Sequence, residues 1–262
     1  MTAPDQLDTE LGRQLADARR LYLDLMVRTV ANTIYMDPDA SPWGNGRFDA
    51  RLRVSGRDWP RVAHTMIGVE RLQSLRALCE AALVHNVPGD FIETGVWRGG
   101  ACILMRAVLA AWGDRHRAVW CADSFEGLPR PDPVRYPADA GDRHHEFAEL
   151  AVSVETVRAH FAVYGLLDER VRFVKGFFAD TLPTLDAGPF AVVRLDGDMY
   201  GSTMDAITAL YDRLSPGGFL VVDDYGAVPG CRAAIEDFRR ERGITAPMHT
   251  IDWTGVWWQR PL

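Results

Sequence analysis

The sequence has no surplus of basic residues, no long apolar run and no signal-peptide pattern. Its 29 Lys and Arg residues are outnumbered by 36 Asp and Glu residues, which leaves a formal net charge of −7. Such a chain is not suited to grip nucleic acid or an anionic membrane surface. No stretch approaches the roughly 18 consecutive apolar residues of a membrane span, and Met1–Glu10 is polar and acidic. We therefore expect a soluble, cytoplasmic protein with neither nucleic-acid nor membrane partners.

Cysteine is scarce, and its spacing carries no motif. The four cysteines are far apart and form no C-x-x-C pair: Cys79, Cys102, Cys121 and Cys231. A disulfide framework is not expected in a chain of 262 residues that can build a full core. The pattern predicts buried thiols that pack as small apolar side chains.

Short apolar strands alternate with helices in the second part of the chain. The expected strands are Asp90–Thr94, Ala118–Ala122, Val171–Val174, Phe190–Leu195 and Gly218–Val222. The helices between and after them are Ala101–Trp112, Val154–Tyr164, Ser202–Leu214 and Gly230–Arg242. This order predicts a parallel sheet with helices on both faces. A final hairpin, Met248–Asp252 and Gly255–Gln259, would complete a doubly wound, mostly parallel seven-stranded α/β sheet.

Residues 1–87 are expected to form a helical extension, and residues 88–262 the main domain. The extension comprises an amphipathic helix, a loop at Tyr35–Trp59 and a second helix at Gly68–His85. The apolar stripe of the first helix recurs at spacings of three and four residues: Leu7, Leu11, Leu15, Ala18, Tyr22 and Leu25. Such a stripe must be buried, either by self-association or as a wall of the substrate site; we expect a homodimer or higher homo-oligomer formed through this helix.

One segment interrupts the alternation of the main domain. Pro129–His145 is rich in Pro and Asp and has no helical or strand periodicity. A long irregular segment inside a domain is typical of a functional lid. We expect a lid at about residues 129–150, beside the strand ends.

Ligands of an open parallel sheet bind at the carboxyl ends of its strands. The first strand runs into Glu93-Thr94-Gly95 and then Gly99-Gly100, an E-x-G-x-x-x-G turn that leads into a helix. The glycines allow a close backbone approach to a ligand. Glu93 would repel a pyrophosphate but attract a cationic ligand such as an α-amino group.

Acidic and aromatic residues follow the next two strands. Asp123 ends the second strand, where it can accept hydrogen bonds from ribose hydroxyls. The loop after the third strand contains Phe178 and Asp180, which could hold an adenine ring and its amine. Each residue could also be a loop cap or a core aromatic, but together they favour a nucleoside site.

Paired carboxylates follow the fourth and fifth strands. Asp196 and Asp198 end one strand, and Asp223 and Asp224 end the other. Charges about 4 Å apart repel by about 4 kcal/mol at an effective dielectric constant of 20, so the group needs a counter-charge. A hard dication with oxygen ligands, such as Mg²⁺, is the simplest one. Helix capping is the alternative, but it explains only one Asp after each strand.

The segment from Phe91 to Gln259 resembles the macrocin O-methyltransferase family of class I S-adenosylmethionine-dependent methyltransferases, which have a Rossmann-like fold. The similarity lies in five motifs: FIETGVWRGG, CADSFEGLP, GFFADTLP, RLDGDMYGST and LVVDDYG. Thr65-Met66 also matches a family segment that reaches over the cofactor.

The resemblance implies a role for each motif. S-adenosylmethionine would be bound by Thr65, Met66, Glu93, Thr94, Gly95, Gly99, Gly100, Asp123, Ser124, Phe125, Phe178 and Asp180. Asp196, Asp223 and Asp224 would bind Mg²⁺. Relatives carry a lysine or histidine base at the position of Met199, which cannot accept a proton, so we expect Asp198 to be the general base.

The implied reaction is Mg²⁺-dependent methylation of a sugar hydroxyl on a glycosylated antibiotic precursor. The acceptor expected first is the 4-hydroxyl of noviose in an aminocoumarin of the novobiocin type, and a macrolide sugar or a catechol are the alternatives. Two other classes of protein use the same kind of sheet, a nicotinamide-dependent oxidoreductase and a non-catalytic nucleotide-binding protein. Neither explains the paired aspartates.

Overall fold

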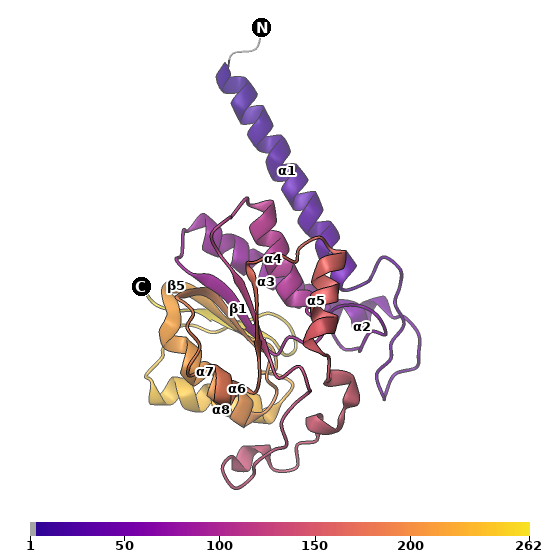
Figure 1. The fold of residues 1–262 in the computed structure, drawn as a ribbon, viewed down its shortest axis with the longest axis vertical. Coiled ribbons are helices and arrows are strands. Elements are labelled where there is room, and N and C mark those ends of the chain that lie inside the picture. Colours follow the sequence, from indigo (N-terminus) through magenta and orange to yellow (C-terminus); the bar gives the residue numbers. More distant parts are fainter. Residues whose placement is uncertain (1–3) are drawn as a thin grey trace.

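A seven-stranded sheet forms the centre of the computed structural model, which describes residues 4–262, with side chains from residue 9 onward (Figure 1). The strand order is β3-β2-β1-β4-β5-β7-β6. β1 to β5 run parallel, and β7 and β6 form an antiparallel edge. The strands are β1 (Asp90–Thr94), β2 (Val119–Asp123), β3 (Val171–Lys175), β4 (Phe190–Leu195), β5 (Leu214–Val222), β6 (His249–Thr250) and β7 (Val256–Gln259). This is the doubly wound, mostly parallel α/β sheet that the sequence predicts.

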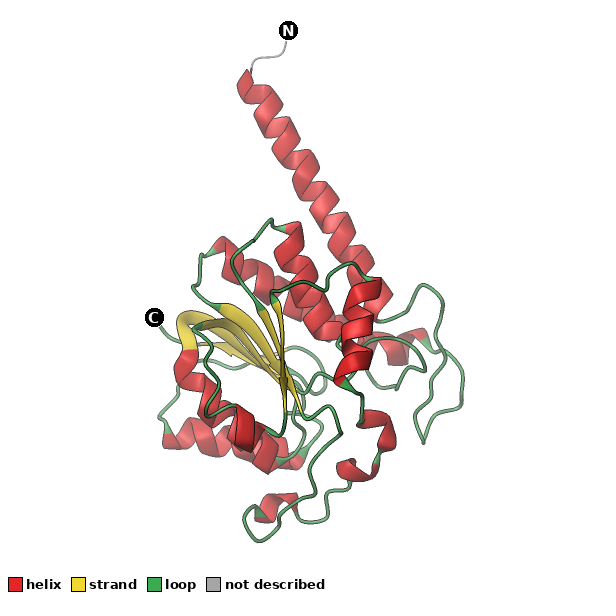
Figure 2. Cartoon of the chain, in the orientation of Figure 1, coloured by secondary structure: helices red, strands yellow, loops and turns green. Residues whose placement is uncertain are grey.

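Helices cover both faces of the sheet, so successive strand residues enter different cores (Figure 2). Phe91 packs with α3 (Gly68–Val84), α4 (Gly100–Ala111) and α5 (Val154–Val163) on one side. The next residue, Ile92, packs with α7 (Tyr200–Leu210) and α8 (Pro229–Glu241) on the other, where the short α6 (Phe178–Thr181) also lies. This two-sided burial explains why β4 is buried along its whole length.

The structure corrects two predicted elements and confirms the prediction for the cysteines. The expected loop Tyr35–Trp59 contains a helix, α2 (Ala50–Ser55), because Asp49 caps its N-terminus and Gly56 ends it at φ +61°. The expected helix Ser202–Leu214 is too long, since Leu214 already pairs with Phe190 as the start of β5. All four cysteines are buried and unpaired, as predicted.

Helix α1 (Pro4–Val30) joins the domain only by its last turns (Figure 1). Leu23, Met26, Val27 and Val30 enter the core beside α4. The predicted stripe is a different face: Leu11, Leu15 and Leu25 are 54%, 63% and 47% exposed, and the side chain of Leu7 lies outside the described ones. Among the described residues, no helix is both long and apolar enough to cross a membrane.

The lid, residues 129–150, consists of loops and three short 3₁₀ turns: η1 (Pro137–Asp139), η2 (His144–Glu146) and η3 (Ala148–Leu150) (Figure 2). Asp139 fastens it to the domain. Its buried carboxylate accepts hydrogen bonds from the backbone N–H groups of Tyr200 and Gly201, at 2.6 and 2.9 Å. Tyr136 adds a hydroxyl contact to Asp205 at 3.2 Å. The lid is therefore anchored at the N-terminus of α7.

Asp139→Ala should loosen the lid, because it removes the acceptor for two helix N-terminal donors. We expect a loss of about 1 kcal/mol, which lowers Tm by about 2–4 °C in a protein of this size. Trypsin should cleave faster at the lid arginines Arg135 and Arg143. Glu149→Ala, at an exposed position in the same lid, is the control. Cleavage as slow as in the unmodified protein would contradict the anchor.

His64 lies in a partly buried cluster just before Thr65-Met66. Its ring stacks on His160 of α5 at a centroid distance of 4.1 Å, and its Nδ1 lies 2.9 Å from the hydroxyl of Tyr164. Burial lowers the pKa of His64 to about 4, and the charges of His160 and Arg98 act in the same direction. The ring is therefore neutral in the folded protein at pH 7.

This depressed pKa predicts acid sensitivity. An unfolded histidine has a pKa of about 6.5, so the unfolded state binds more protons between about pH 6.5 and 4, and stability is lost as the pH falls through that window. Between pH 7 and 5, His64→Asn should lose less stability than the unmodified protein, by on the order of 1 kcal/mol after screening at this part-exposed site. Urea unfolding at both pH values measures this. Equal losses in the two proteins would contradict it.

Candidate active site

β2 and β3 lie on one side of β1, whereas β4 and β5 lie on its other side, so the strand order reverses between β1 and β4. The glycine turn follows β1 at this point. Gly95, at φ +86°, follows β1 and passes so close to the carbonyl oxygen of Asp196 that a Cβ atom would collide with it. Asp123, the last residue of β2, stabilises the turn. Its carboxylate accepts hydrogen bonds from the backbone N–H groups of Val96 at 2.6 Å and Trp97 at 3.4 Å. Asp123 thus shapes the turn as well as facing the cavity.

The end of the turn supports the segment that precedes α3. Gly100 donates its N–H to the carbonyl oxygen of His64 at 2.8 Å, and a side chain at Gly100 would strike His64 and Thr65. Gly99 takes φ +91° at the start of α4. These two glycines therefore place Thr65 and Met66 over the strand ends.

A cavity of about 660 Å³ lies at the carboxyl ends of β1, β4 and β5. Twelve of the predicted site residues line it: Thr65, Met66, Glu93, Gly95, Asp123, Ser124, Phe178, Asp180, Asp196, Asp198, Asp223 and Asp224. Thr94, Gly99 and Gly100 lie beside the cavity as backbone supports. The Phe125 side chain instead packs in the core, with its ring centroid 6.2 Å from that of Phe173.

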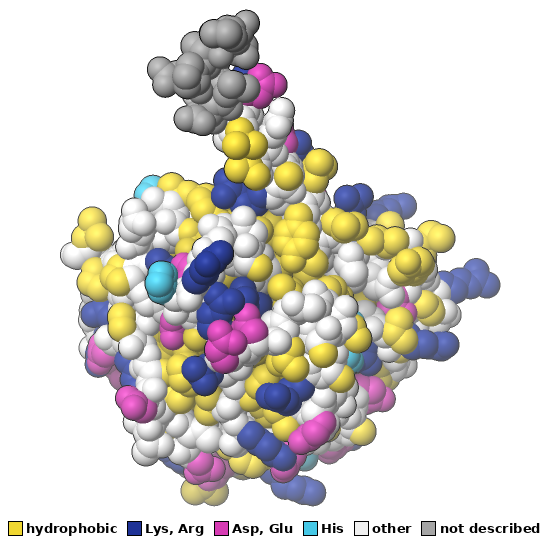
Figure 3. Space-filling view, turned by 45° about the horizontal axis from the view of Figure 1, so that its top comes forward, with side chains coloured by type: hydrophobic (Ala, Val, Ile, Leu, Met, Phe, Trp, Pro, Cys, Tyr) yellow, Lys and Arg dark blue, Asp and Glu magenta, His cyan; other side chains and the backbone are white. Residues whose placement is uncertain are grey.

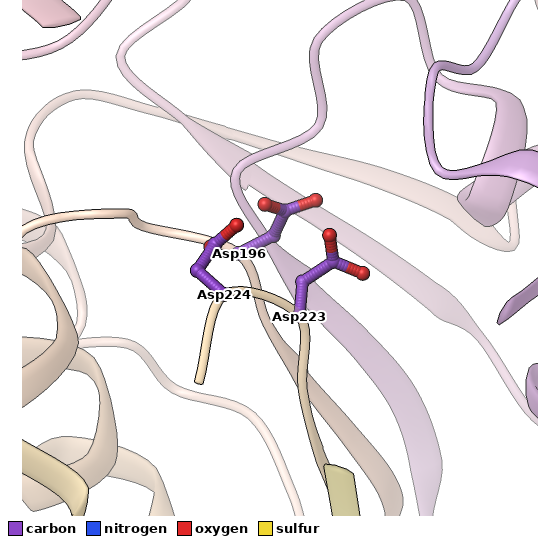
Figure 4. Close-up of side chains that lie close together, drawn as sticks. All are labelled: Asp196, Asp223 and Asp224. Atoms are coloured by element: carbon purple, nitrogen blue, oxygen red, sulfur yellow. The ribbon is translucent and has the colours of Figure 1, made fainter. Parts of the chain in front are cut away.

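Asp196, Asp223 and Asp224 converge at the ends of β4 and β5 (Figure 4). Each offers a carboxylate oxygen, and these oxygens lie within 4.8 Å of one another. Asp224 is buried, and one of its oxygens accepts only a long bond of 3.3 Å from the N–H of Asp198. Three convergent hard oxygen donors fit a divalent cation such as Mg²⁺.

Arg194 and Arg71 supply counter-charge that the sequence reasoning missed. Arg194, on β4 and 1% exposed, contacts Glu93 and Asp223 and lies 2.7 Å from Asp196. Arg71, on α3, contacts Asp223 and lies 3.1 Å from Asp252. A charged residue inside the otherwise apolar strand FAVVRL was the signal that could have identified Arg194.

These two guanidinium groups are outnumbered by six carboxyl groups in and beside this part of the cavity: Glu93, Asp196, Asp198, Asp223, Asp224 and Asp252. Burial raises the pKa of Glu93 to about 7, against the opposing charge of Arg194. Burial also raises the pKa of Asp196 and of Asp224, and neighbouring carboxylates raise both further. An additional positive charge at this site would therefore be electrostatically favourable.

Asp198 stands at a strained position between β4 and α7. Its φ is +57°, an angle that residues other than glycine rarely adopt. Such angles are frequent at functional sites. Burial raises the pKa of Asp198 to about 7, the charge of His144 lowers it, and Asp196 and Asp223 raise it further. Met199, next to it, is buried.

His144 brings the lid to this position. Its Nδ1 lies 2.7 Å from Asp142, and both residues line the cavity. Burial lowers the pKa of His144, but the carboxylates of Asp198 and Asp142 outweigh this effect and raise it. The lid thus contributes to the cavity an imidazole whose cationic form is favoured by the carboxylates of Asp198 and Asp142.

Comparison with known proteins identifies the family. The profile described as Macrocin-O-methyltransferase (TylF) matches residues 18–260. The chain is 53% identical to an 8-demethyl-8-(2,3-dimethoxy-alpha-L-rhamnosyl)-tetracenomycin-C 4'-O-methyltransferase of Streptomyces olivaceus over 93% of this chain and 94% of that one. It is 47% identical to a demethyldecarbamoylnovobiocin O-methyltransferase of Streptomyces niveus over 96% of this chain and 97% of that one. It is 49% identical to a mycinamicin III 3''-O-methyltransferase of Micromonospora griseorubida over 92% and 96%.

Solved structures agree with this assignment. The O-methyltransferase NovP superposes with a TM-score of 0.89 at 48% identity and covers 93% of this chain and all of its own. The calicheamicin methyltransferase CalS11, at 20% identity and a TM-score of 0.59, shares the fold over 80% of this chain and 90% of its own. An oxidoreductase or a non-catalytic nucleotide-binding protein is thereby excluded. The chain belongs to the macrocin O-methyltransferase family of class I methyltransferases, and it is an O-methyltransferase that uses S-adenosylmethionine.

Proposed function

We propose that this enzyme methylates a hydroxyl group of a deoxysugar on a glycosylated antibiotic precursor, with the help of Mg²⁺ and in the cytoplasm. Three similar enzymes are named for a rhamnosyl-tetracenomycin, a novobiocin precursor and mycinamicin III. The 4-hydroxyl of noviose, expected from the sequence, and the 4′ position named for the tetracenomycin enzyme point to the same ring position. The proposed acceptor is therefore the 4-hydroxyl of a deoxysugar.

The observation that carries this proposal is the position of Asp198 in one cavity with the glycine turn and the aspartate trio. The reaction requires an acceptor oxygen in line with the sulfonium methyl group and a base beside that oxygen. Glu93 and Gly95 would bind the methionine part of the donor, and Asp198 would face the acceptor. Positioning of this kind supplies much of the rate of a bimolecular displacement.

Asp198 would accept the proton of the sugar hydroxyl. An ordinary Asp, with a pKa of about 3.9, is a weak base, whereas burial raises the pKa of Asp198 to about 7. This makes it a stronger base, half ionised near pH 7 and largely ionised above that pH. The lid, anchored by Asp139, would exclude water from the cavity while His144 balances the charge on Asp198.

Asp196, Asp223 and Asp224 would hold the divalent cation. When bound, the cation supplies positive charge that lowers the pKa of an adjacent hydroxyl group. Arg194 and Arg71 would keep the carboxylates ionised and in place before the cation binds, because they pair with Asp196 and Asp223.

Asp198→Asn should keep donor binding but lose the base. With labelled S-adenosylmethionine and a panel of deoxysugar glycosides, we expect methyl transfer by the unmodified enzyme and at least about a hundredfold lower turnover in the variant. Calorimetry should show unchanged binding of S-adenosylhomocysteine. Asp212→Asn, at an exposed position, is the matched control. Turnover of Asp198→Asn near that of the control would remove Asp198 as the base.

Removal of divalent cations by a chelator tests whether turnover requires Mg²⁺. Exhaustive EDTA treatment should abolish turnover and leave the fold intact by circular dichroism, and added Mg²⁺ should restore turnover. Asp224→Asn should shift the Mg²⁺ dependence to higher concentrations, since it removes one of three ligands. Full activity after EDTA treatment would contradict the proposal.

We also propose that the exposed face of α1 pairs with α1 of a second copy. Leu11, Leu15, Ala18, Tyr22 and Leu25 recur at spacings of four and three residues, the pattern of a coiled-coil seam. Apolar side chains lie along this helix and around its base on the molecular surface (Figure 3). An unsupported helix segment is marginal in water, and pairing would bury the seam. Acidic and basic residues, such as Asp17 and Arg20, flank it.

Sedimentation velocity tests this pairing. The unmodified chain should sediment as a dimer or larger species, and Leu15→Glu should shift it to a monomer whose main domain still unfolds cooperatively on heating. Val163→Glu, at a position 76% exposed on α5, is the control. A monomeric unmodified chain, or a Leu15→Glu variant that still associates, would contradict the pairing.

A further inference from the structure

Three aromatic rings form a cluster where the N-terminal extension meets the lid. Trp43 and Trp59 belong to the extension, and Phe147 belongs to the lid. The ring centroids of Trp43 and Trp59 are 4.8 Å apart, and that of Phe147 lies 5.2 Å from Trp59 and 6.4 Å from Trp43. All three contacts are edge-to-face, with interplanar angles of 66° to 87°. Because Trp43 is 63% exposed, much of its ring surface is accessible to another flat group.

The cluster is not part of the hydrophobic core. Trp43 is 63% exposed, although burying such a ring is strongly favourable. Phe147 and Trp59 are only partly buried. A large exposed apolar ring at the edge of a cavity is typical of a surface that a ligand covers.

The cluster is continuous with the catalytic cavity. Trp43 and Trp59 line this cavity together with Asp198 and the aspartate trio. Phe147 also approaches the ring of His144, with centroids 6.3 Å apart, and His144 is the lid residue that feels the charge of Asp198. The aromatic cluster therefore borders the cavity through Trp43 and Trp59 and contacts the lid residue His144 through Phe147.

The lining of the cavity combines two kinds of side chain. Carboxylates that suit a cation and a polyhydroxylated ring gather at the aspartate trio. The lining also includes the apolar residues Trp43, Trp59, Leu128, Pro129 and Pro131. A molecule with a polar sugar at one end and a flat apolar ring at the other would match both kinds of side chain.

We infer that Trp43, Trp59 and Phe147 form an aglycone subsite that stacks a flat aromatic group attached to the acceptor sugar. This inference rests on the proposed function, since it assigns the non-sugar part of that substrate. The subsite binds the aglycone away from the reacting oxygen. It therefore lowers KM and leaves kcat unchanged, as uniform binding does.

Matched glycosides test the subsite. One carries L-rhamnose on a methyl group (methyl α-L-rhamnoside), and the other carries it on 4-methylumbelliferone. The unmodified enzyme should show a lower KM for the aryl glycoside. Trp43→Ala should raise that KM by about two- to tenfold, the range expected for one lost aromatic contact, with no change in kcat or in the KM of the methyl glycoside. Trp43→Phe should restore most of the difference. Tyr35→Ala, which removes an aromatic ring 82% exposed outside the cavity lining, is the control.

Equal KM values for the two glycosides in the unmodified enzyme, or an equal rise for both in Trp43→Ala, would overturn the subsite while leaving the proposed function intact. If neither glycoside is methylated, fluorescence titration with free 4-methylumbelliferone tests the aglycone subsite separately from the proposed methylation of a sugar. Binding by the unmodified enzyme that weakens in Trp43→Ala supports the subsite even though the sugar assignment fails. Binding that is absent, or the same in both proteins, overturns the subsite.

Discussion

Arg194 lies almost fully buried among carboxyl groups from three strands. It contacts Glu93 on β1 and reaches Asp196 and Asp223 beyond the ends of β4 and β5. Without it, three acidic groups would share a buried site with little compensation, and each unpaired charge would cost several kcal/mol. The ion-pair network therefore allows Glu93, proposed to bind the donor, and the aspartate trio, proposed to bind the cation, to lie side by side. Because six carboxyl groups still exceed the two guanidinium groups, the same network leaves the site receptive to a dication.

The rest of the architecture holds this group of charges in place. Parallel pairing sets Glu93 of β1 directly beside Arg194 of β4, and the two-sided burial of the sheet fixes that register. Gly95 permits the close approach of the two strand ends. Helix α3 contributes Arg71 from the N-terminal extension, so the extension is a structural part of the site. The lid closes the other side, where Asp139 binds the N-terminus of α7 and His144 faces Asp198.

The sequence predicts the parts of this structure that depend on local pattern. β1 and β4 begin and end at the residues expected, because each is an apolar run that stops at a turn or an acidic pair. The neighbouring positions of Asp196, Asp223 and Asp224 follow from strand order alone. Helix α2 was missed because six residues are too few for a periodic signal. The roles of Arg194, Arg71 and Asp139 depend on strand register and on contacts between distant segments, such as Asp139 with Tyr200, which no local spacing encodes.

The central claim is that the aspartate trio, with its arginine partners, binds one divalent cation beside the donor site. Electron paramagnetic resonance of Mn²⁺, titrated into the full chain loaded with S-adenosylhomocysteine, tests this most directly because it measures the ion itself. The account predicts one bound Mn²⁺ per chain, competition by Mg²⁺, and at least about tenfold weaker binding in Asp224→Asn. Absence of bound Mn²⁺, or binding that Asp224→Asn leaves unchanged, would contradict it.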